Sequence, residues 1–272
     1  MKKNIKKQKD RGVHRLEFGI CVSNIEEAKI AEEAGYDFVE STVVSLVPEE
    51  SEEAFQEVLK KYKELTIPVK ACNVFLPGDL KIVGKNVDQK RVKKYVESAL
   101  NRVKELGAET VVFGSGDART ISEDEYPREK VEEQIVEFLH LVADEAERVG
   151  LTIVIEPLNT KESNIINSVA EGVEFAKKVN RSTIQVLADF YHMDEEKEPL
   201  VEIVKHKDYL KHIHLADTHR HQPGTGSYPY EEFVNCVKEA NYKGRLSIES
   251  NWTDFNVDEL RKSLLFLKEQ FQ

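Results

Sequence analysis

The feature that most constrains the fold of this chain is the regular return of short apolar runs, rich in β-branched residues, between longer charged segments. Each run is too short for a typical helix and apolar enough for a buried parallel strand. There are eight of them, at residues 18–22, 37–40, 69–72, 110–113, 152–156, 184–189, 210–215 and 245–249. The chain is therefore expected to build a sheet of parallel strands.

The segments between these runs have the hydrophobic period of amphipathic helices. They cover residues 25–34, 52–65, 88–106, 130–149, 168–179, 199–205, 230–240 and 257–271. Gly35, Gly107 and Gly150 directly follow three of them, at the position where a helix C-cap favours glycine. Eight strands that alternate with eight helices predict a (β/α)8 TIM barrel.

An open, doubly wound sheet is the competing architecture, but it often has a glycine-rich phosphate loop after its first strand. Here the first run continues into residues 22–25, Val-Ser-Asn-Ile, with neither a GxGxxG motif nor a Walker loop. No Pro- or Ser-rich linker divides the chain. We therefore expect a single barrel domain over residues 14–272, preceded by a basic, solvated and frayed N-terminal extension at residues 1–13.

Charge and composition exclude several classes of protein. Lys and Arg number 39 against 50 Asp and Glu, and this net charge of -11 disfavours a general nucleic-acid binder. No apolar stretch approaches the roughly 18 to 20 residues that span a bilayer. The three cysteines, Cys21, Cys72 and Cys236, form no CxxC pair, and no leading apolar segment of signal-peptide type is present. These features predict a cytoplasmic protein that needs no disulfide scaffold.

Four consecutive strands end in side chains that bind metal ions. Glu156, Asp189 and Glu249 end the fifth, sixth and eighth runs, and His214 lies near the end of the seventh. The carboxyl ends of barrel strands converge on one site, so these side chains are expected to meet. Three carboxylates and one imidazole form a hard, mostly oxygen donor set, which favours Mn2+ and also suits Mg2+, Co2+ or Zn2+.

Around these residues the sequence resembles the xylose-isomerase-like barrels, which include ketose 3-epimerases of the tagatose and psicose type. The matching motifs are Glu-Pro-Leu-Asn-Thr-Lys-Glu at 156–162, Ala-Asp-Phe-Tyr-His at 188–192, the segment from His212 to Gly226, and Ile-Glu at 248–249. The resemblance implies a metal-dependent sugar isomerase or epimerase, and a ketose 3-epimerase first of all. Such an enzyme removes a proton beside a carbonyl and returns it through an enediolate.

The resemblance also implies a role for each matching residue. Glu156, Asp189, His214 and Glu249 would hold one divalent ion, and Glu156 and Glu249 would also act as the acid/base pair. The implied substrate-binding residues are Glu162, His192 and Arg220. The expected partner is a small sugar, with no nucleic acid and no membrane, and a dimer or tetramer of this chain stays open.

Other activities on the same scaffold stay open. An isomerase of hydroxypyruvate or another aldose–ketose pair is one, because the loop from Arg220 to Gly226 also resembles that branch, and a dehydratase of keto-inositols is another. A nuclease similar to endonuclease IV is disfavoured, because the third and fourth strands end without the histidines of that family. Fold analogy does not choose among the remaining activities.

Three further residues have competing interpretations. Glu40 ends the second run, where it either orients a metal ligand or caps the loop. His212 shares a strand face with His214 but lies deeper, and is expected to be a hydrogen-bonded core histidine rather than a ligand. Cys72 ends the third run and is expected to be a small buried thiol rather than a substrate contact.

Overall fold

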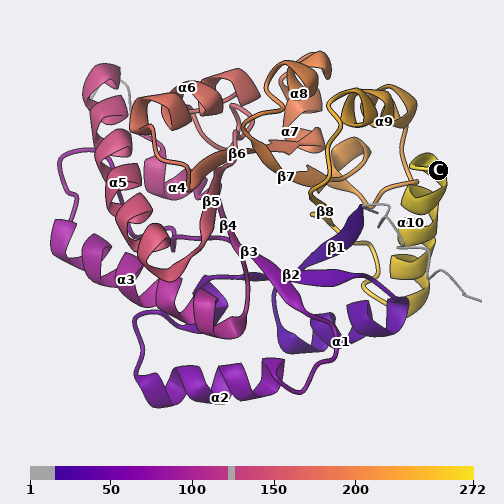
Figure 1. Ribbon diagram of the computed structural model, residues 1–272, viewed down its shortest axis with the longest axis horizontal. Coiled ribbons are helices and arrows are strands. Elements are labelled where there is room, and N and C mark those ends of the chain that lie inside the picture. Colours follow the sequence, from indigo (N-terminus) through magenta and orange to yellow (C-terminus); the bar gives the residue numbers. More distant parts are fainter. Residues whose placement is uncertain (1–15, 122–125) are drawn as a thin grey trace, which may run out of the picture.

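The computed structural model describes residues 16–121 and 126–272. Within them, the predicted barrel is confirmed: eight parallel strands pair in chain order and β8 closes the ring against β1 (Figure 1). The strands are β1 (Glu17–Val22), β2 (Phe38–Thr42), β3 (Val69–Asn73), β4 (Thr110–Phe113), β5 (Thr152–Ile155), β6 (Ile184–Asp189), β7 (Leu210–Leu215) and β8 (Arg245–Ile248). The basic extension predicted at residues 1–13 lies outside the described residues.

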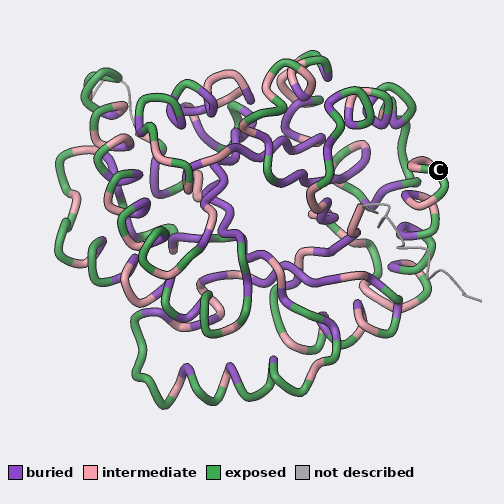
Figure 2. The backbone as a smooth tube through the Cα atoms, in the orientation of Figure 1, coloured by how far each residue is buried: buried purple, intermediate pink, exposed green. Residues whose placement is uncertain are grey.

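Helices surround the ring of strands and turn their polar faces to solvent (Figures 1 and 2). Those with predicted counterparts are α1 (Ile25–Ala34), α2 (Glu52–Tyr62), α3 (Gln89–Leu106), α5 (Arg128–Val149), α6 (Val169–Val179), α8 (Val201–Lys205), α9 (Tyr230–Glu239) and α10 (Val257–Gln270). Four short elements were not predicted: η1 (Val44–Leu46), α4 (Gly116–Arg119), α7 (Phe190–Glu195) and η2 (Thr218–Arg220). Each is too short to show a hydrophobic period.

Local sequence explains where several helices begin and end. The side chain of Asn24 accepts hydrogen bonds from the backbone N–H groups of Glu26 and Glu27 at the start of α1. Gly35, Gly107 and Gly150 end α1, α3 and α5 with φ angles of 89°, 97° and 73°. Glycine adopts this left-handed conformation without the steric penalty of a Cβ atom, so the three predicted C-caps are confirmed.

The inside of the barrel is divided between an apolar side and a polar side. Val112, Val154 and Leu187, from β4, β5 and β6, form a small apolar cluster of their own. Glu40, His212 and Ser247, from β2, β7 and β8, form a hydrogen-bonded polar cluster. All six side chains are at most 1% exposed, so the polar side depends on internal hydrogen bonds in place of water.

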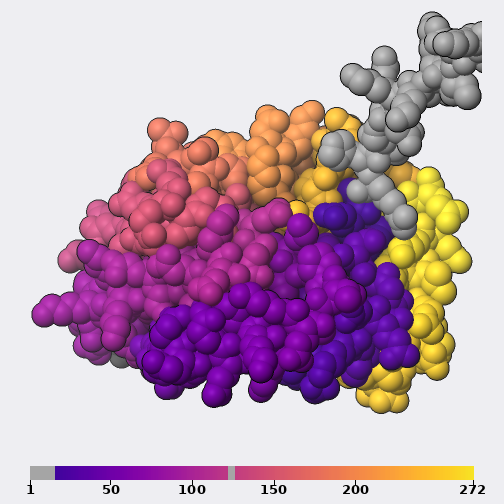
Figure 3. Space-filling model, turned by 60° about the horizontal axis from the view of Figure 1, so that its bottom comes forward, coloured from indigo at the N-terminus to yellow at the C-terminus, as the bar shows by residue number. Residues whose placement is uncertain are grey.

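The two ends of the described chain lie together. The yellow C-terminal segment adjoins the indigo segment that contains β1 and α1 (Figure 3), because β8 pairs with β1 and α10 packs on α1. A membrane-spanning helix would need a long apolar stretch, and none of the helices in the described part of the chain has one.

Candidate metal centre and substrate pocket

The four predicted ligands meet at the carboxyl end of the barrel. Glu156 directly follows β5, Asp189 ends β6, His214 lies in β7, and Glu249 directly follows β8. One donor atom from each residue lies within 4.8 Å of the donor atoms of the other three. The structure therefore brings together all four residues that the sequence singled out.

His214 is at the middle of this cluster and is fully buried. Its Nδ1 atom lies 3.1 Å from Oε1 of Glu156, 3.2 Å from Oε2 of Glu249 and 3.8 Å from Oδ2 of Asp189. Its Nε2 atom points the other way, 3.0 Å from Oε1 of Glu40. One ring nitrogen thus faces the three carboxylates and the other faces the polar side of the barrel interior.

Burial and like charge act differently on the two glutamates. Burial raises the pKa of Glu156, and the nearby carboxylate of Glu249 raises it further. Burial also opposes ionisation of Glu249, but His214 and Arg220 outweigh it and hold the pKa of Glu249 well below its usual range. Asp189 and Glu156 are 2% and 5% exposed, whereas the side chain of Glu249 is 20% exposed, so two of the three carboxylates are shielded from water.

The close approach of β4 to Glu156 depends on a glycine. A Cβ atom at Gly114 would lie 2.2 Å from Oε2 of Glu156, far inside van der Waals contact. Gly114 directly follows β4 and lines the same hollow as Glu156. Any larger residue at this position would displace the carboxylate from the centre.

Arg220 and Glu162, two of the residues predicted to bind substrate, lie beside the centre. Arg220 donates from Nη2 to Oε2 of Glu249 at 2.8 Å and from Nη1 to Oε1 of Glu162 at 3.2 Å. Its guanidinium carbon lies 5.0 Å from the ring centroid of Tyr191, a cation–π distance. These contacts fix a cation at the edge of the carboxylate cluster.

His192, the third predicted substrate-binding residue, has one ring nitrogen without a partner. The backbone N–H of Asn159 donates to Nδ1 of His192 at 3.1 Å, so in the neutral ring Nε2 carries the proton. Nε2 is buried, has no hydrogen-bond partner among the described residues, and lies 4.0 Å from Oδ2 of Asp189. It is a buried donor beside the centre, available to an oxygen atom of a bound molecule.

Sequence analysis missed two asparagines that hold the predicted residues in place. The side-chain amide of Asn159 contacts Oε1 of Glu162 and Nδ1 of His192, both at 2.9 Å. Asn73, the last residue of β3, donates from Nδ2 to Oε1 of Glu249 at 2.9 Å. The only sequence signals were the position of Asn159 inside the 156–162 motif and the position of Asn73 at a strand end.

The three residues with competing interpretations are now placed. Glu40 contacts the imidazole of His214 inside the barrel, which supports its orienting role over a loop cap. His212 is a hydrogen-bonded core histidine, as predicted, with Nε2 2.7 Å from Oε2 of Glu40 and 1% exposure. Cys72 is fully buried within the apolar core, as predicted, and burial raises the pKa of its thiol.

A hollow of about 240 Å³ opens above the centre. Its charged lining comes from Asp117, Glu156, Glu162, Arg220 and Glu249. Its other walls come from the end of β3, the loops after β3, β4 and β5, and the start of α4, namely Asn73, Val74, Leu76, Gly78, Gly114, Ser115, Gly116 and Leu158. This hollow therefore borders the carboxylate cluster directly.

A closed parallel barrel with carboxylates and a histidine gathered at the carboxyl ends of its strands has the architecture of a barrel enzyme. Residues 28–270 match the model of the xylose isomerase-like TIM barrel family, and the chain belongs to this family. The resemblance inferred from the motifs is thereby confirmed.

The relatives are carbohydrate epimerases. A 3-dehydro-D-guloside 4-epimerase from Escherichia coli K12 is 25% identical over 83% of this chain and 86% of its own length. A D-psicose 3-epimerase from Agrobacterium fabrum is 32% identical, over 42% of this chain and 40% of its own length. The crystal structure of a 3-keto-D-glucoside 4-epimerase from E. coli superposes with a TM-score of 0.79 at 25% identity, covering 94% of this chain and 100% of that one. These relatives identify the chain as an isomerase.

Proposed function

We propose that this protein is a metal-dependent epimerase that inverts the hydroxyl-bearing carbon beside the ketone of a sugar, with C3 of a free ketose as the first candidate. The observation that carries the proposal is the meeting of Glu156 and Glu249 with Asp189 around Nδ1 of His214. Two carboxylates at one centre supply a base that removes a proton and an acid that returns one.

The donor set fits a divalent cation. Three carboxylates surround one imidazole nitrogen, and burial together with the charge of Glu249 raises the pKa of Glu156. This electrostatic cost is what a bound dication would relieve. Mn2+ is the ion we propose, with Mg2+, Co2+ or Zn2+ as alternatives suited to the same ligands. When bound, the ion polarises the ketone and stabilises the negative charge of the enediolate.

The two glutamates would divide the proton transfers between them. One carboxylate takes the proton from the carbon beside the ketone, and the other delivers a proton to the opposite face, which inverts the configuration. His214, and to a smaller extent Arg220, which donates directly to Glu249, hold the pKa of that carboxyl below its usual range. We assign no order to the two glutamates, since either direction of epimerisation exchanges their roles.

Glu162, His192 and Arg220 would bind the oxygens of the sugar. Nε2–H of His192 is a buried donor that a substrate oxygen would satisfy, and Asn159 holds the ring so that this donor faces the centre. Arg220 and Glu162 form an ion pair at the wall of the hollow, where a hydroxyl can receive a hydrogen bond from the cation and donate one to the carboxylate.

A second candidate is epimerisation at C4 of a 3-keto glycoside. It is favoured by the E. coli 4-epimerase, whose similarity extends over 83% of this chain, whereas the psicose epimerase aligns over 42%. The chemistry is the same, because C4 is the hydroxyl-bearing carbon beside a ketone at C3. The two candidates differ in the carbon that exchanges its proton and in the presence of an aglycone.

Incubation of the manganese-loaded protein in D2O with a panel of substrates tests the proposal. The panel contains free ketoses, 3-keto glycosides, aldoses and hydroxypyruvate. Deuterium located by NMR at C3 of a ketose supports the first candidate, and deuterium at C4 of a 3-keto glycoside supports the second. Aldose–ketose interconversion without epimerisation, or no exchange with any member of the panel, contradicts the proposed epimerase.

A further inference from the structure

Glu40 lies inside the barrel beneath the metal centre and uses its two carboxylate oxygens differently. Oε2 is 2.7 Å from Nε2 of His212 and accepts a hydrogen bond from Oγ of Ser247, also at 2.7 Å. Oε1 is left for one partner, Nε2 of His214, at 3.0 Å. One oxygen is thus anchored by β7 and β8, and the other is presented to a predicted metal ligand.

Both ring nitrogens of His214 face carboxylates. Nε2 faces Oε1 of Glu40, and Nδ1 lies 3.1 Å from Oε1 of Glu156 and 3.2 Å from Oε2 of Glu249. A cation held by Glu156, Asp189 and Glu249 would take the Nδ1 lone pair. The proton of the neutral ring would then lie on Nε2, where Oε1 of Glu40 accepts its hydrogen bond.

A purely structural role does not account for this polar cluster. The opposite side of the same interior is filled by Val112, Val154 and Leu187, which is the usual apolar packing of a barrel. A buried carboxylate with a histidine and a serine costs desolvation that such packing avoids. The polar residues lie on the side of the interior that reaches His214.

We infer that Glu40 is a positioning residue that fixes His214 as an Nδ1 ligand, and that His212 and Ser247 hold Glu40 in place for this task. The inference rests on the metal site of the proposed function but not on its substrate. Partners of this kind typically change metal affinity by about 10-fold to 100-fold.

The first test measures Mn2+ affinity of the whole protein by calorimetry. In Glu40→Gln one carboxylate oxygen is replaced by an amide N–H2 group, so the side chain can accept a hydrogen bond from only one of the two histidines, and we expect affinity to fall by about 10-fold to 100-fold. Ser247→Ala keeps the carboxylate and removes one anchor, so we expect a smaller fall, of about threefold to fivefold. Val112→Ala, on the apolar side of the interior, is the matched control and should change affinity less than twofold.

The second test observes the tautomer directly. In zinc-loaded protein carrying 15N-histidine, NMR should show His214 bound through Nδ1 with its proton on Nε2. In Glu40→Gln we expect that proton to exchange faster with solvent, an effect that loosened packing in Val112→Ala should not reproduce.

Several results would overturn the inference. The first is that zinc binds His214 through Nε2. The second is that Glu40→Gln and Ser247→Ala both bind Mn2+ with an affinity within twofold of the parent. The third is that the parent binds no Mn2+. A parent that binds Mn2+ with the expected dependence on Glu40 but epimerises no sugar would contradict the proposed function and leave the inference standing.

Discussion

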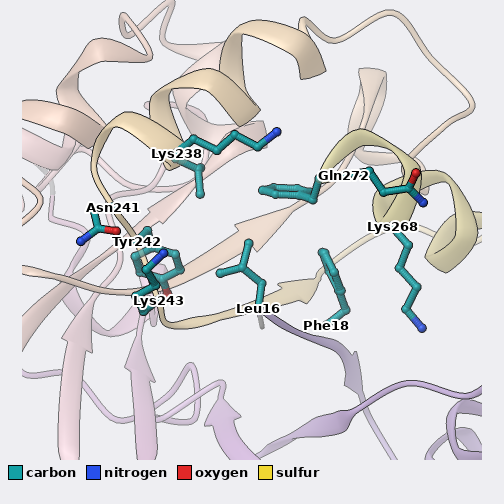
Figure 4. Close-up of a pocket in the computed structure, with 10 residues that line it drawn as sticks. Leu16, Phe18, Lys238, Asn241, Tyr242, Lys243, Lys268 and Gln272 are labelled. Carbon is teal, nitrogen blue, oxygen red and sulfur yellow. The ribbon is translucent and has the colours of Figure 1, made fainter. Parts of the chain in front are cut away.

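Where the barrel strands begin, a hollow of about 730 Å³ lies beside β1 between α9 and α10 (Figure 4), whereas the hollow above Glu156 and Glu249 at the opposite end measures about 240 Å³. The larger hollow is lined by apolar side chains such as Leu16 and Phe18, with Lys238, Lys243 and Lys268 among its polar residues. The side chains of Asp117, Glu156, Glu162 and Glu249 bring carboxylates to the lining of the smaller hollow, whereas no Asp or Glu lines the larger one.

The comparison teaches that the direction of the strands, and not the volume of a cavity, locates chemistry in this fold. Successive strands bring their carboxyl ends to one side of the ring, so four short stretches far apart in sequence deliver Glu156, Asp189, His214 and Glu249 to one point. At the end of the barrel where the strands begin, the larger hollow is lined by the C-terminal parts of α9 and α10 and by nearby loops, and no carboxylates gather there. The following predictions test this contrast, starting with the largest effect.

Replacement of either glutamate should have the largest effect. Glu156→Gln and Glu249→Gln should each lower turnover by about 10²-fold to 10⁴-fold, because an amide cannot take up the proton. Both variants need excess Mn2+ and a check of occupancy. We expect opposite preferences in deuterium exchange, each variant labelling one epimer. Label in the same epimer from both, or turnover at the parent rate, would exclude two separate bases.

Asp189→Asn should lower Mn2+ affinity more than about 100-fold, because it removes a charged oxygen from the cluster. Elemental analysis after dialysis would measure the loss. The thermal unfolding of the metal-free variant serves as the control, since a folded protein without metal separates loss of the ligand from loss of the fold. Full occupancy in Asp189→Asn would remove this residue from the centre.

Arg220→Gln and His192→Ala should lower kcat/KM by about 10-fold to 100-fold, the cost of one lost hydrogen bond from a charged or buried donor. Mn2+ affinity should be retained in both, and in Arg220→Gln the loss of a cation beside Glu249 should if anything tighten it. Calorimetry and steady-state kinetics on the same preparations would show this separation. Loss of bound Mn2+ in either variant would show that the replaced residue helps to hold the metal and does not act on the substrate alone.

Glu198→Gln should remove part of the pH dependence of stability. Burial raises the pKa of Glu198 to about 7, against the hydrogen bond from Val169 N–H. The folded protein therefore binds this proton more tightly than the unfolded chain, and the contribution of Glu198 to stability falls as pH rises from about 4.5 to 7. After allowance for solvent screening the effect is on the order of 1 kcal/mol. The melting temperatures of parent and variant are measured at pH 5 and pH 8. The change in melting temperature between these two pH values should be smaller in Glu198→Gln than in the parent.

Lys238→Ala and Lys243→Ala, in the larger hollow, should have the smallest effects. Neither residue lies near the strand ends that carry the metal centre, so Mn2+ affinity and turnover should stay within twofold of the parent. A tenfold loss of turnover in either variant would show that the end of the barrel where the strands begin takes part in the reaction.

The fold could be predicted because each strand and most helices carry a local signal. The β-branched runs favour strands at their own positions, and the glycines after α1, α3 and α5 end the helices that directly precede them. The short helices α4 and α7 have too few residues to show a period. The start of α7 does have a local signal, because the side chain of Asp189 accepts from the backbone N–H groups of Tyr191 and His192, whereas α4 has no such cap.

The meeting of Glu156, Asp189, His214 and Glu249 was predictable for the same reason, since the four residues stand at or next to strand ends. The supporting contacts were not. Glu40 and His212 are 172 residues apart, and Asn73 and Glu249 are 176 apart. Glu40 lies in the middle of β2 and not, as the sequence predicts, at its end, because the strand continues to Thr42. Whether Glu40 contacts a histidine depends on which residues face each other across the closed ring.

The closure of the ring also sets an order of events in time. β8 joins β1 through pairs such as Gly19 with Ser247, and Glu249 directly follows β8. During synthesis on the ribosome, Glu156, Asp189 and His214 emerge well before the strand that completes the ring. Pairing of strands so distant in sequence is slow, because the conformational entropy of closing a long loop is lost before the strand contacts form. The four side chains of the candidate metal centre therefore come together only once the last strand has docked.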